Sequence, residues 1–327
     1  MNEPLLEVHD LSVQYSDGEK RLKAVDRVSF ALRRGSILAL VGESGCGKTT
    51  VALAALGLLP EQGNLVGGEV RFEGRALGSL GRDELRRLRG REISIIFQDP
   101  ASGLNPVLSI GQQVEEIIRA HAAVSKREAR PLAYDALRRV GLANPEELAK
   151  RYPYQLSGGM SQRVLIAIAT VLNPKVIIAD EPTSALDVTV QAGILQELER
   201  LRDERGISIL LITHDLGIVA QMADEVVVMY AGRIAEQGAT REVLRRPRHP
   251  YTWSLLATLP RIDQERRPLV AIQGAPPDPS ELPDECAFLP RCRKALSACR
   301  TQPSPALAEL TPGHRAACYN PVYHPEE

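Results

Sequence analysis

Gly42-Glu-Ser-Gly-Cys-Gly-Lys48-Thr49 is the stretch that decides the fold of this chain. It follows a short apolar run at residues 36–41, which we expect to be a buried strand, and precedes a helical pattern at 50–58. Glycine, four residues and then Gly-Lys-Thr between a strand and a helix is the pattern of a phosphate-binding loop. The backbone amides of such a loop converge on a phosphate, and the following helix N-terminus adds partial positive charge. The sequence therefore predicts a nucleoside triphosphate site here.

Two side chains of this loop have predicted roles of their own. Lys48 is expected to reach the β- and γ-phosphates, and Thr49 is expected to place its hydroxyl on Mg²⁺. Cys46 occupies a variable position, where a small filler is the simpler interpretation than a redox group. Nucleotide binding is assigned to the loop and the residue after it: Gly42, Ser44, Gly45, Cys46, Gly47, Lys48, Thr49 and Thr50.

Composition is that of a globular protein and excludes several function classes. Of 327 residues, 44% are hydrophobic and 25% are charged, and the formal net charge is −1. A nearly neutral chain with 4% aromatic residues lacks the basic surface and stacking platforms that nucleic-acid binding requires, so we expect no nucleic-acid partner. The acidic N-terminus is unlike a signal peptide, and no apolar run approaches the roughly 18 to 20 residues that cross a bilayer. We therefore expect a soluble, cytosolic chain.

Short β-rich runs alternate with helical patterns through most of the chain, as a parallel α/β sheet requires. Residues 36–41, 175–180 and 207–213 are apolar runs that we expect to form strands buried on both faces. Residues 5–30 contain alternating segments that better suit an antiparallel β layer. Ligands of parallel sheets bind beyond the carboxyl ends of the strands, so we expect the residues that follow each run to lie near a ligand site.

Between residues 98 and 172 the pattern becomes helical, with amphipathic segments at 112–121 and 126–140. We interpret this stretch as a helical subdomain inserted into the α/β core. The remaining residues, after about 255, are rich in proline, which excludes long regular elements there.

Asp180-Glu181 ends the second apolar run with two carboxylates. By itself such a pair would indicate a surface turn or a helix cap. With a phosphate loop present, a carboxylate at a strand end suits a water-mediated Mg²⁺ ligand, which is the role predicted for Asp180. Glu181 is then placed to orient or deprotonate the attacking water.

Leu156-Ser-Gly-Gly-Met-Ser-Gln-Arg163 precedes a strongly apolar helix. Ser157 is a natural N-cap, and the two glycines after it expose backbone amides at the helix start. The chain therefore has a second predicted anion-binding helix start, although one nucleotide does not need both.

With these segments in this order, the chain resembles the nucleotide-binding domains of ABC ATPases. In that family the Leu-Ser-Gly-Gly signature of one subunit closes over the ATP held by the phosphate loop of a second subunit. The resemblance implies that Ser157, Gly158 and Gly159 act on the partner's ATP. It also implies a P-loop NTPase (RecA-like) α/β core with an antiparallel β layer, an inserted helical subdomain and a small Cys/Pro-rich C-terminal extension. The implied domains are residues 1–255 and 256–327.

Isolated residues gain roles from the same resemblance. Tyr15 lies where an aromatic ring stacks on adenine. Gln98, in Ile95-Ile-Phe-Gln-Asp-Pro100, matches the Q-loop that contacts Mg²⁺ and senses the transporter. Asp187, in Ser184-Ala-Leu-Asp187, matches the D-loop, which crosses the dimer interface. His214, in Ile212-Thr-His-Asp215, matches the switch histidine at the γ-phosphate. The implied catalytic set is Lys48, Glu181 and His214.

Further segments narrow the resemblance to the dipeptide and oligopeptide importer branch, which shares most of these marks with nickel importers. They are Arg89-Gly-Arg-Glu-Ile93, Gly103-Leu-Asn-Pro106, Arg248-His-Pro-Tyr-Thr252 and Phe288-Leu-Pro-Arg-Cys292. The resemblance implies a peripheral ATP-hydrolysing motor subunit on the cytoplasmic face of the inner membrane. Its implied partners are a related, non-identical ATPase subunit, two transmembrane permease subunits and an extracytoplasmic substrate-binding protein. The alternatives are a nickel cargo, or a soluble ABC ATPase that acts on DNA or ribosomes.

Four cysteines gather in the C-terminal extension: Cys286, Cys292, Cys299 and Cys318. In a reducing compartment such a group indicates metal binding before disulfides, and a metal would staple a segment with few apolar residues. Members of the importer branch can carry an iron–sulfur cluster in this extension, and four thiolates suit a 4Fe-4S cluster. A structural zinc is the second alternative, although zinc sites favour shorter spacings, and no metal is the third. We expect a structural role; a redox sensor that controls the ATPase is the rival interpretation.

Overall fold

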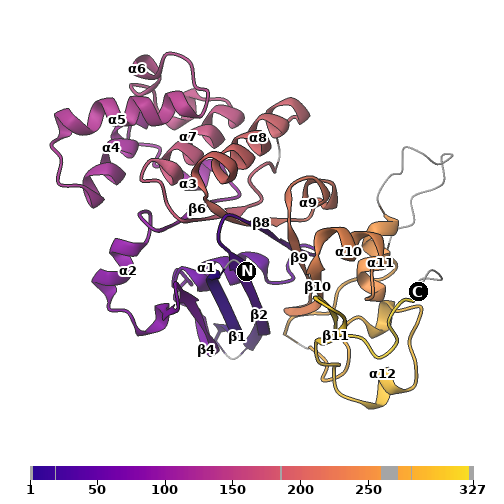
Figure 1. Cartoon of the computed structure of the whole chain (residues 1–327). Coiled ribbons are helices and arrows are strands. Elements are labelled where there is room, and N and C mark those ends of the chain that lie inside the picture. The colour runs from indigo at the N-terminus through magenta and orange to yellow at the C-terminus, as the bar shows by residue number, and fades with distance from the viewer. Residues whose placement is uncertain (1–2, 19, 185, 259–271, 281, 324–327) are drawn as a thin grey trace. The chain divides into compact units, whose positions relative to one another are not determined.

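The computed structural model describes residues 3–18, 20–184, 186–258, 272–280 and 282–323 (Figure 1). Two compact units can be distinguished, each assembled from separate segments of the chain. The first consists mainly of the described residues of Ser79–Ile212. The second is built from those of Leu6–Ala31, Leu38–Gly78 and Thr213–Glu327.

Three neighbouring parallel strands lie in the first unit: β6 (Ile93–Ile96), β7 (Val176–Asp180) and β8 (Ser208–Thr213). Every residue of β7 and β8 is buried. Parallel sheets are covered on both faces, so their strands are continuous apolar runs rather than alternating ones. The predicted strands at residues 175–180 and 207–213 are therefore confirmed.

The helices of the first unit lie in the chain segments before and after β7. Two of them, α4 (Ile110–His121) and α5 (Lys126–Arg139), confirm the predicted amphipathic helices and both pack on α7. Each begins at a serine whose side chain accepts from the backbone three residues on, in a reciprocal capping box with Gln112 or Glu128. The others are α2 (Arg82–Leu88), α3 (Pro100–Gly103), α6 (Pro145–Leu148), α7 (Gly158–Thr170), α8 (Val188–Arg205) and the 3-10 turn η2 (Pro153–Gln155).

The second unit contains the strand before the phosphate loop, β3 (Ile37–Val41), which pairs in parallel with β9 (Glu225–Tyr230). Beyond β9 the order continues through β10 (Arg233–Ala239), β12 (His314–Ala316) and β11 (Ala308–Thr311), all antiparallel. The C-terminal extension thus adds two short strands beside β10. A buried contact fixes them, because His314 Nε2 lies 2.7 Å from Oε1 of the fully buried Glu236.

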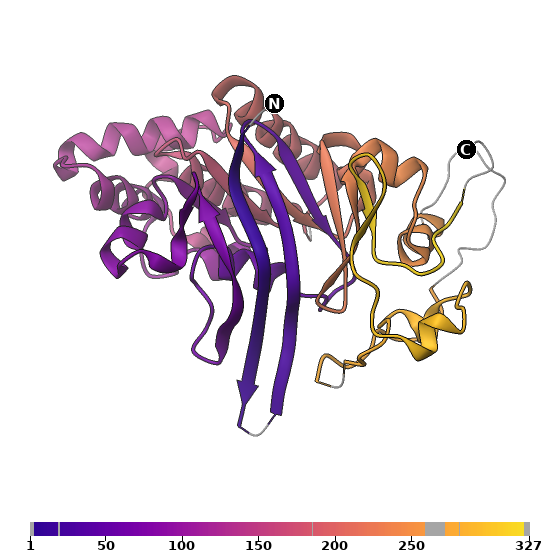
Figure 2. The ribbon, with the colours of Figure 1, turned by 60° about the horizontal axis from the view of Figure 1, so that its bottom comes forward.

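A second sheet of this unit has the order β2-β1-β4-β5 (Figure 2). Its strands are β1 (Pro4–Asp17), β2 (Lys20–Arg33), β4 (Gly63–Phe72) and β5 (Arg75–Ala76), followed by the 3-10 turn η1 (Leu77–Ser79). The pairs β1–β4 and β4–β5 are antiparallel. The predicted antiparallel β layer is therefore confirmed.

Four helices of the second unit are α1 (Lys48–Ala55), α9 (Leu216–Met222), α10 (Thr240–Arg245) and α11 (Pro250–Ala257). The helix predicted at residues 50–58 begins earlier and ends earlier than expected. Gly57, with φ of 61°, turns the chain after α1, whereas the apolar pattern continues to Leu59. The pattern of apolar residues does not predict this turn, because it continues past Gly57.

In the described part of the extension, regular elements are short, as its prolines predicted. They are η3 (Leu289–Arg291), α12 (Ala298–Thr301) and the strands β11 and β12. Pro260 and Pro268 lie outside the described residues. Phe288 is buried and packs with Tyr230 and Tyr251, which ties the extension to the core of its unit. Within the described residues, none of the helices combines the length and the apolar character that spanning a bilayer requires.

Candidate functional site

The phosphate loop joins β3 to α1 in a backbone conformation that only glycine adopts easily. Gly47 has φ of 103°, and a Cβ there would lie 2.4 Å from the carbonyl oxygen of Ala24. Gly42 is similarly confined, since its Cβ would lie 2.3 Å from Met229 O. Among the described residues no side chain caps α1, so its first amides face the loop. This is the geometry of an anion cradle.

Lys48 lies along the loop and not away from it. Its Nζ donates to the carbonyl oxygens of Gly42, at 2.8 Å, and Glu43, at 3.0 Å. The side chain is buried, and Cys46 Sγ is 3.7 Å from the same Nζ. Burial raises the pKa of the Cys46 thiol more than Lys48 lowers it, which favours the protonated thiol. Thr49, by contrast, is exposed.

Tyr15 reaches the same region from β1. Its hydroxyl lies 3.3 Å from Oγ1 of Thr50 on α1, and the ring packs closely against Gly63 on the neighbouring strand. His214 belongs to the same unit, follows β8 directly and is exposed. The carboxylate of Asp215 caps α9 by accepting from Gly217 N and Ile218 N. The structure therefore groups Tyr15, the phosphate loop and His214 in one compact unit.

The first unit holds the other predicted residues of the nucleotide site. Gln98 Nε2 donates to Glu181 Oε2 at 3.0 Å, so the Q-loop amide and the predicted catalytic carboxylate lie side by side. Asp180 is buried at the end of β7. Glu181 has φ of 45°, a left-handed conformation, and its amide donates to Ile212 O at 2.8 Å. Such strained non-glycine residues gather at functional sites.

The signature segment starts α7 in the same unit. Ser157 caps this helix, because its Oγ accepts from Met160 N at 3.4 Å. A Cβ on Gly159 would lie 2.7 Å from Val190 on α8, so the glycine lets the two helices approach closely. Asp187 caps α8 in turn by accepting from Val190 N at 3.0 Å. The signature and the D-loop are therefore neighbours; Ala185 of the D-loop lies outside the described residues.

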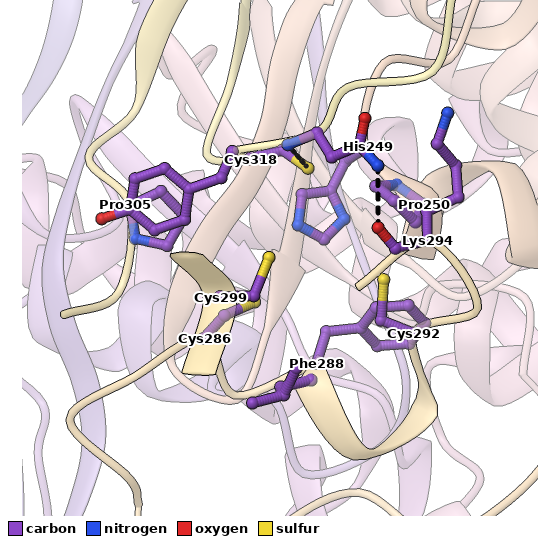
Figure 3. A pocket seen from close by; sticks show the side chains of 12 residues that line it. His249, Pro250, Cys286, Phe288, Cys292, Lys294, Cys299, Pro305 and Cys318 are labelled. Carbon is purple, nitrogen blue, oxygen red and sulfur yellow. Dashed lines mark hydrogen bonds between the residues drawn. The ribbon is translucent and has the colours of Figure 1, made fainter. Parts of the chain in front are cut away.

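The four cysteines of the extension line one cavity, together with His249 and Lys294 (Figure 3). All four are free thiols. Burial raises the pKa of Cys286, Cys292 and Cys318, the last to about 12. Among the described residues no group of three or more His, Cys, Asp or Glu side chains is arranged to hold a metal ion. The cysteines that line this cavity are soft donors, which by ligand type suit a thiolate-bound metal better than a hard cation.

One contact of the phosphate loop was not expected from the sequence. The guanidinium of Arg291, in the extension, forms two hydrogen bonds with the carboxylate of Glu43, at 2.7 and 3.0 Å. The hydroxyl of Tyr251 accepts from the Glu43 amide at 2.9 Å. No sequence spacing signals this pair, because the two residues are 248 positions apart.

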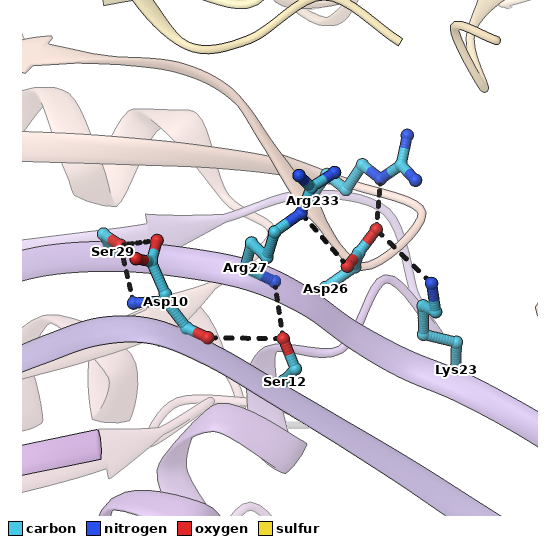
Figure 4. Close-up of polar contacts among 7 residues, drawn as sticks. All are labelled: Asp10, Ser12, Lys23, Asp26, Arg27, Ser29 and Arg233. Atoms are coloured by element: carbon cyan, nitrogen blue, oxygen red, sulfur yellow. Dashed lines mark hydrogen bonds and ion pairs between the residues drawn. The ribbon is translucent and has the colours of Figure 1, made fainter. Parts of the chain in front are cut away.

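Charged side chains surround the buried Asp26 (Figure 4). Its carboxylate accepts from Arg233 Nε at 2.7 Å and pairs with Lys23 and Arg27. Burial raises the pKa of Asp26, but the hydrogen bond and charge of Arg233, with the charges of Lys23 and Arg27, outweigh it and lower the pKa. Backbone bonds lead from Asp26 to the loop through Gly232, which donates to Cys46 O at 3.1 Å.

Comparisons with known proteins agree with this geometry. Residues 25–184 match the family described as ABC transporter, and residues 235–299 match the family described as oligopeptide/dipeptide transporter, C-terminal region. The chain is 44% identical to the oligopeptide transport ATP-binding protein AppD of Bacillus subtilis, over 96% of each chain. It is 45% identical to the oligopeptide transport ATP-binding protein OppD of Escherichia coli, over 97% of this chain and 94% of the relative.

Solved structures show the same fold. A dimeric ATP-binding cassette in a post-hydrolysis state, bound to ADP and phosphate, superimposes with a TM-score of 0.65 at 30% identity. The match covers 72% of this chain and 99% of that cassette. A protein from Clostridium perfringens that is part of an ABC transporter complex matches with a TM-score of 0.63 at 32% identity, over 74% of this chain and 91% of its own. The predicted P-loop NTPase fold is therefore confirmed.

Proposed function

Because the chain belongs to the family of oligopeptide-type ABC transporter ATP-binding proteins, we propose that it is the ATP-hydrolysing motor of a di- and oligopeptide importer. The observation that carries the proposal is the phosphate loop itself, with its glycine-dependent backbone and uncapped helix start. The two oligopeptide transport relatives support the peptide cargo, since they match nearly the whole chain. A nickel cargo remains the alternative within the branch.

Each residue of the proposed ATP site has a distinct task. The loop amides and Lys48 bind the phosphates, Thr49 and Gln98 contact Mg²⁺, and Asp180 holds it through water. Glu181 directs the attacking water, and its contact with Gln98 supports this assignment because both must face the same phosphate. Further roles are adenine stacking by Tyr15 and a γ-phosphate contact by His214. Catalysis is then mostly positioning and electrostatic stabilisation.

A second ATPase subunit completes this site. Its signature, equivalent to Ser157, Gly158 and Gly159, closes over the ATP, while the segment around Asp187 crosses the interface. The close packing of the signature on α8 supports a joint movement of the two segments. In the proposed assembly two related ATPases on the cytoplasmic face of the inner membrane drive two transmembrane permease subunits. A binding protein outside the membrane delivers the peptide.

We also propose a division of labour along the chain. Residues 1–255 form the nucleotide-binding domain, and residues 98–172 form its helical subdomain. Residues 256–327 are the C-terminal extension, in which Cys286, Cys292, Cys299 and Cys318 would hold a 4Fe-4S cluster, or zinc as the second candidate. Their convergence on one cavity supports a bound metal, which would staple this segment.

Glu181→Gln in the purified importer tests the motor role. The amide cannot take a proton from water, so the variant should bind ATP, accumulate an ATP-loaded closed dimer and hydrolyse ATP at least about 100-fold more slowly. Glu61→Gln, at an exposed carboxylate, is the matched control and should retain wild-type turnover. ATP-dependent uptake of a labelled tripeptide into proteoliposomes reports the cargo. Near-normal turnover by Glu181→Gln would remove the assigned role.

Metal analysis of protein purified without oxygen tests the extension. We expect iron and sulfide in the wild type and their loss in Cys292→Ser. Cys46→Ala removes the one cysteine outside the cavity and should leave the metal content unchanged. Stoichiometric zinc without iron would favour the second candidate, and a metal-free, fully folded wild type would overturn both.

A further inference from the structure

We propose that Arg291 is a positioning residue of the ATP site, which holds and neutralises the Glu43 carboxylate of the phosphate loop. This inference rests on the proposed nucleotide site and adds to it a residue from the C-terminal extension. Its consequence is that the extension takes part in ATP binding, in addition to any metal it carries.

The pair has the geometry of a fixed, two-pronged contact. Arg291 Nη1 lies 2.7 Å from Oε2 of Glu43, and Nη2 lies 3.0 Å from Oε1. A guanidinium that engages both oxygens of a carboxylate fixes its orientation as well as its charge. The arginine side chain is only 4% exposed and the glutamate 24% exposed. Water therefore screens this pair less than it screens a surface ion pair.

Arg291 is itself held on several sides. Its Nη1 also donates to the hydroxyl of Tyr230 at 3.2 Å, and its Nε donates to Gln273 O at 3.2 Å. The guanidinium carbon lies 5.8 Å from the centre of the Tyr230 ring and 6.0 Å from that of Phe288. Arginine stacks on such rings and lysine does so less well. The cation is thus set in place before any nucleotide binds.

The contact reaches the lysine of the loop through one residue. The Glu43 amide donates to the hydroxyl of Tyr251, and the Glu43 carboxylate accepts from Arg291. Hydrogen bonds therefore hold both the backbone and the side chain of Glu43. The backbone carbonyl oxygen of Glu43 accepts from Lys48 Nζ. If Glu43 moves, the carbonyl oxygen that binds Lys48 Nζ moves with it, and the position of the lysine side chain changes.

The charges of Glu43 and Arg291 predict the direction in which ATP affinity changes when either residue is removed. Glu43 brings a negative charge into a loop whose ligand is a polyphosphate, and Arg291 cancels that charge. Removing only the arginine leaves a carboxylate that repels ATP, whereas removing both residues leaves no charge there. A purely structural contact would instead make the two single variants and the double variant equally weak.

The test compares four forms of the full-length chain by titration with trinitrophenyl-ATP and Mg²⁺: wild type, Arg291→Gln, Glu43→Gln and the double variant. We expect Arg291→Gln to raise Kd about tenfold, an effect of the size that one partly screened charge produces. Adding Glu43→Gln should recover most of this loss. Arg293→Gln removes an exposed arginine from the same segment and should stay within about twofold of wild type.

Arg291→Lys keeps the positive charge without the two-pronged contact, so it should lie between wild type and Arg291→Gln. Thermal unfolding of each variant identifies any that are not folded, and the lysine variant then supplies the comparison. A folded Arg291→Gln chain with wild-type Kd would overturn the proposal, as would a double variant as weak as Arg291→Gln. A wild-type chain that binds no nucleotide would instead contradict the proposed function.

Discussion

Two helices of this chain have glycines at their starts, in predicted anion-binding segments, yet they begin differently. The start of α1 has no side-chain cap among the described residues, and its glycine, Gly47, has a backbone conformation that other residues avoid. The start of α7 is capped by Ser157, and its Gly159 has an ordinary helical backbone. The glycine of α1 shapes a loop; the glycine of α7 removes a side chain between two helices.

The difference teaches that the same residue type can build an anion site in two ways. In the phosphate loop the backbone turns at glycines, and Lys48 of the same loop lies along it by donating to the carbonyl oxygen of Gly42. In the signature the helix start is a firm, exposed surface braced by α8. The first suits a site that binds nucleotide by itself, and the second suits a surface that completes the site of another subunit.

The largest effect should come from Lys48→Ala, which removes the charge of the first helix start. We expect ATP affinity to fall at least about 100-fold, because a buried cation at the proposed phosphate site has no substitute in the loop. Equilibrium binding to the full-length chain measures this. Lys126→Ala, at an exposed lysine of α5, should bind ATP normally. Equal affinity of Lys48→Ala and wild type would place the phosphates elsewhere.

Gly47→Ala tests whether backbone conformation makes the first helix start. The new Cβ would meet Ala24 O in a left-handed residue, at a cost of about 1–3 kcal/mol, so the loop should distort and ATP affinity should fall about tenfold. Gly81 has φ of −65° and open space around its Cβ position, which makes Gly81→Ala the matched control. Unchanged binding by a folded Gly47→Ala chain would show that the conformation is not required.

Ser157→Ala sharpens the contrast at the second helix start. We expect unchanged ATP binding by the separate chain, but about tenfold slower hydrolysis by the assembled importer, because the cap orients the amides that face the partner's ATP. Ser125→Ala removes an equivalent cap on α5 and should cost similar stability, about 1 kcal/mol, without slowing hydrolysis. If both variants hydrolyse ATP equally fast, the signature has no role beyond helix stability.

The smallest effect concerns Asp26, which backbone hydrogen bonds connect through Gly232 to the loop before the first helix start. Its pKa is lowered in the folded chain, so its ion pairs stabilise the fold above the ordinary aspartate pKa of about 3.9. Asp26→Asn should lose about 1 kcal/mol near pH 7. This advantage of the wild type should vanish as pH falls through the lowered pKa. Urea unfolding of both proteins at several pH values measures the difference, and an advantage that persists at the acid end would contradict the assignment.

Much of the fold could be predicted because its strongest signals are local. The runs that became β3, β7 and β8 are mostly apolar, since both faces of a parallel strand are buried. The caps at Ser109 and Ser125 were not predicted, although each depends only on residues three positions away. The end of α1 was missed because Gly57 breaks the helix within a run that stays apolar, so periodicity gave no warning.

The candidate site divides along the same line. Lys48 could be selected from the spacing of its loop, and Glu181 from its place after a strand once the phosphate loop had been identified. The hydrogen bonds between Arg291 and Glu43 could not be predicted. They depend on how a proline-rich segment packs against the phosphate loop, and such a segment has no periodicity. The burial of Tyr251 could not be predicted either, because its hydroxyl contacts Glu43, which is distant in the sequence.

The strands β11 and β12, added to β10 by the extension, have a consequence for biosynthesis. Until residues 308–316 leave the ribosome, β10 has no neighbour on that side and is an open strand edge. Open edges pair with other chains, and incomplete domains are the species most prone to do so. We therefore expect a chain truncated before residue 308, which leaves this edge of β10 uncovered, to aggregate more readily than the full chain.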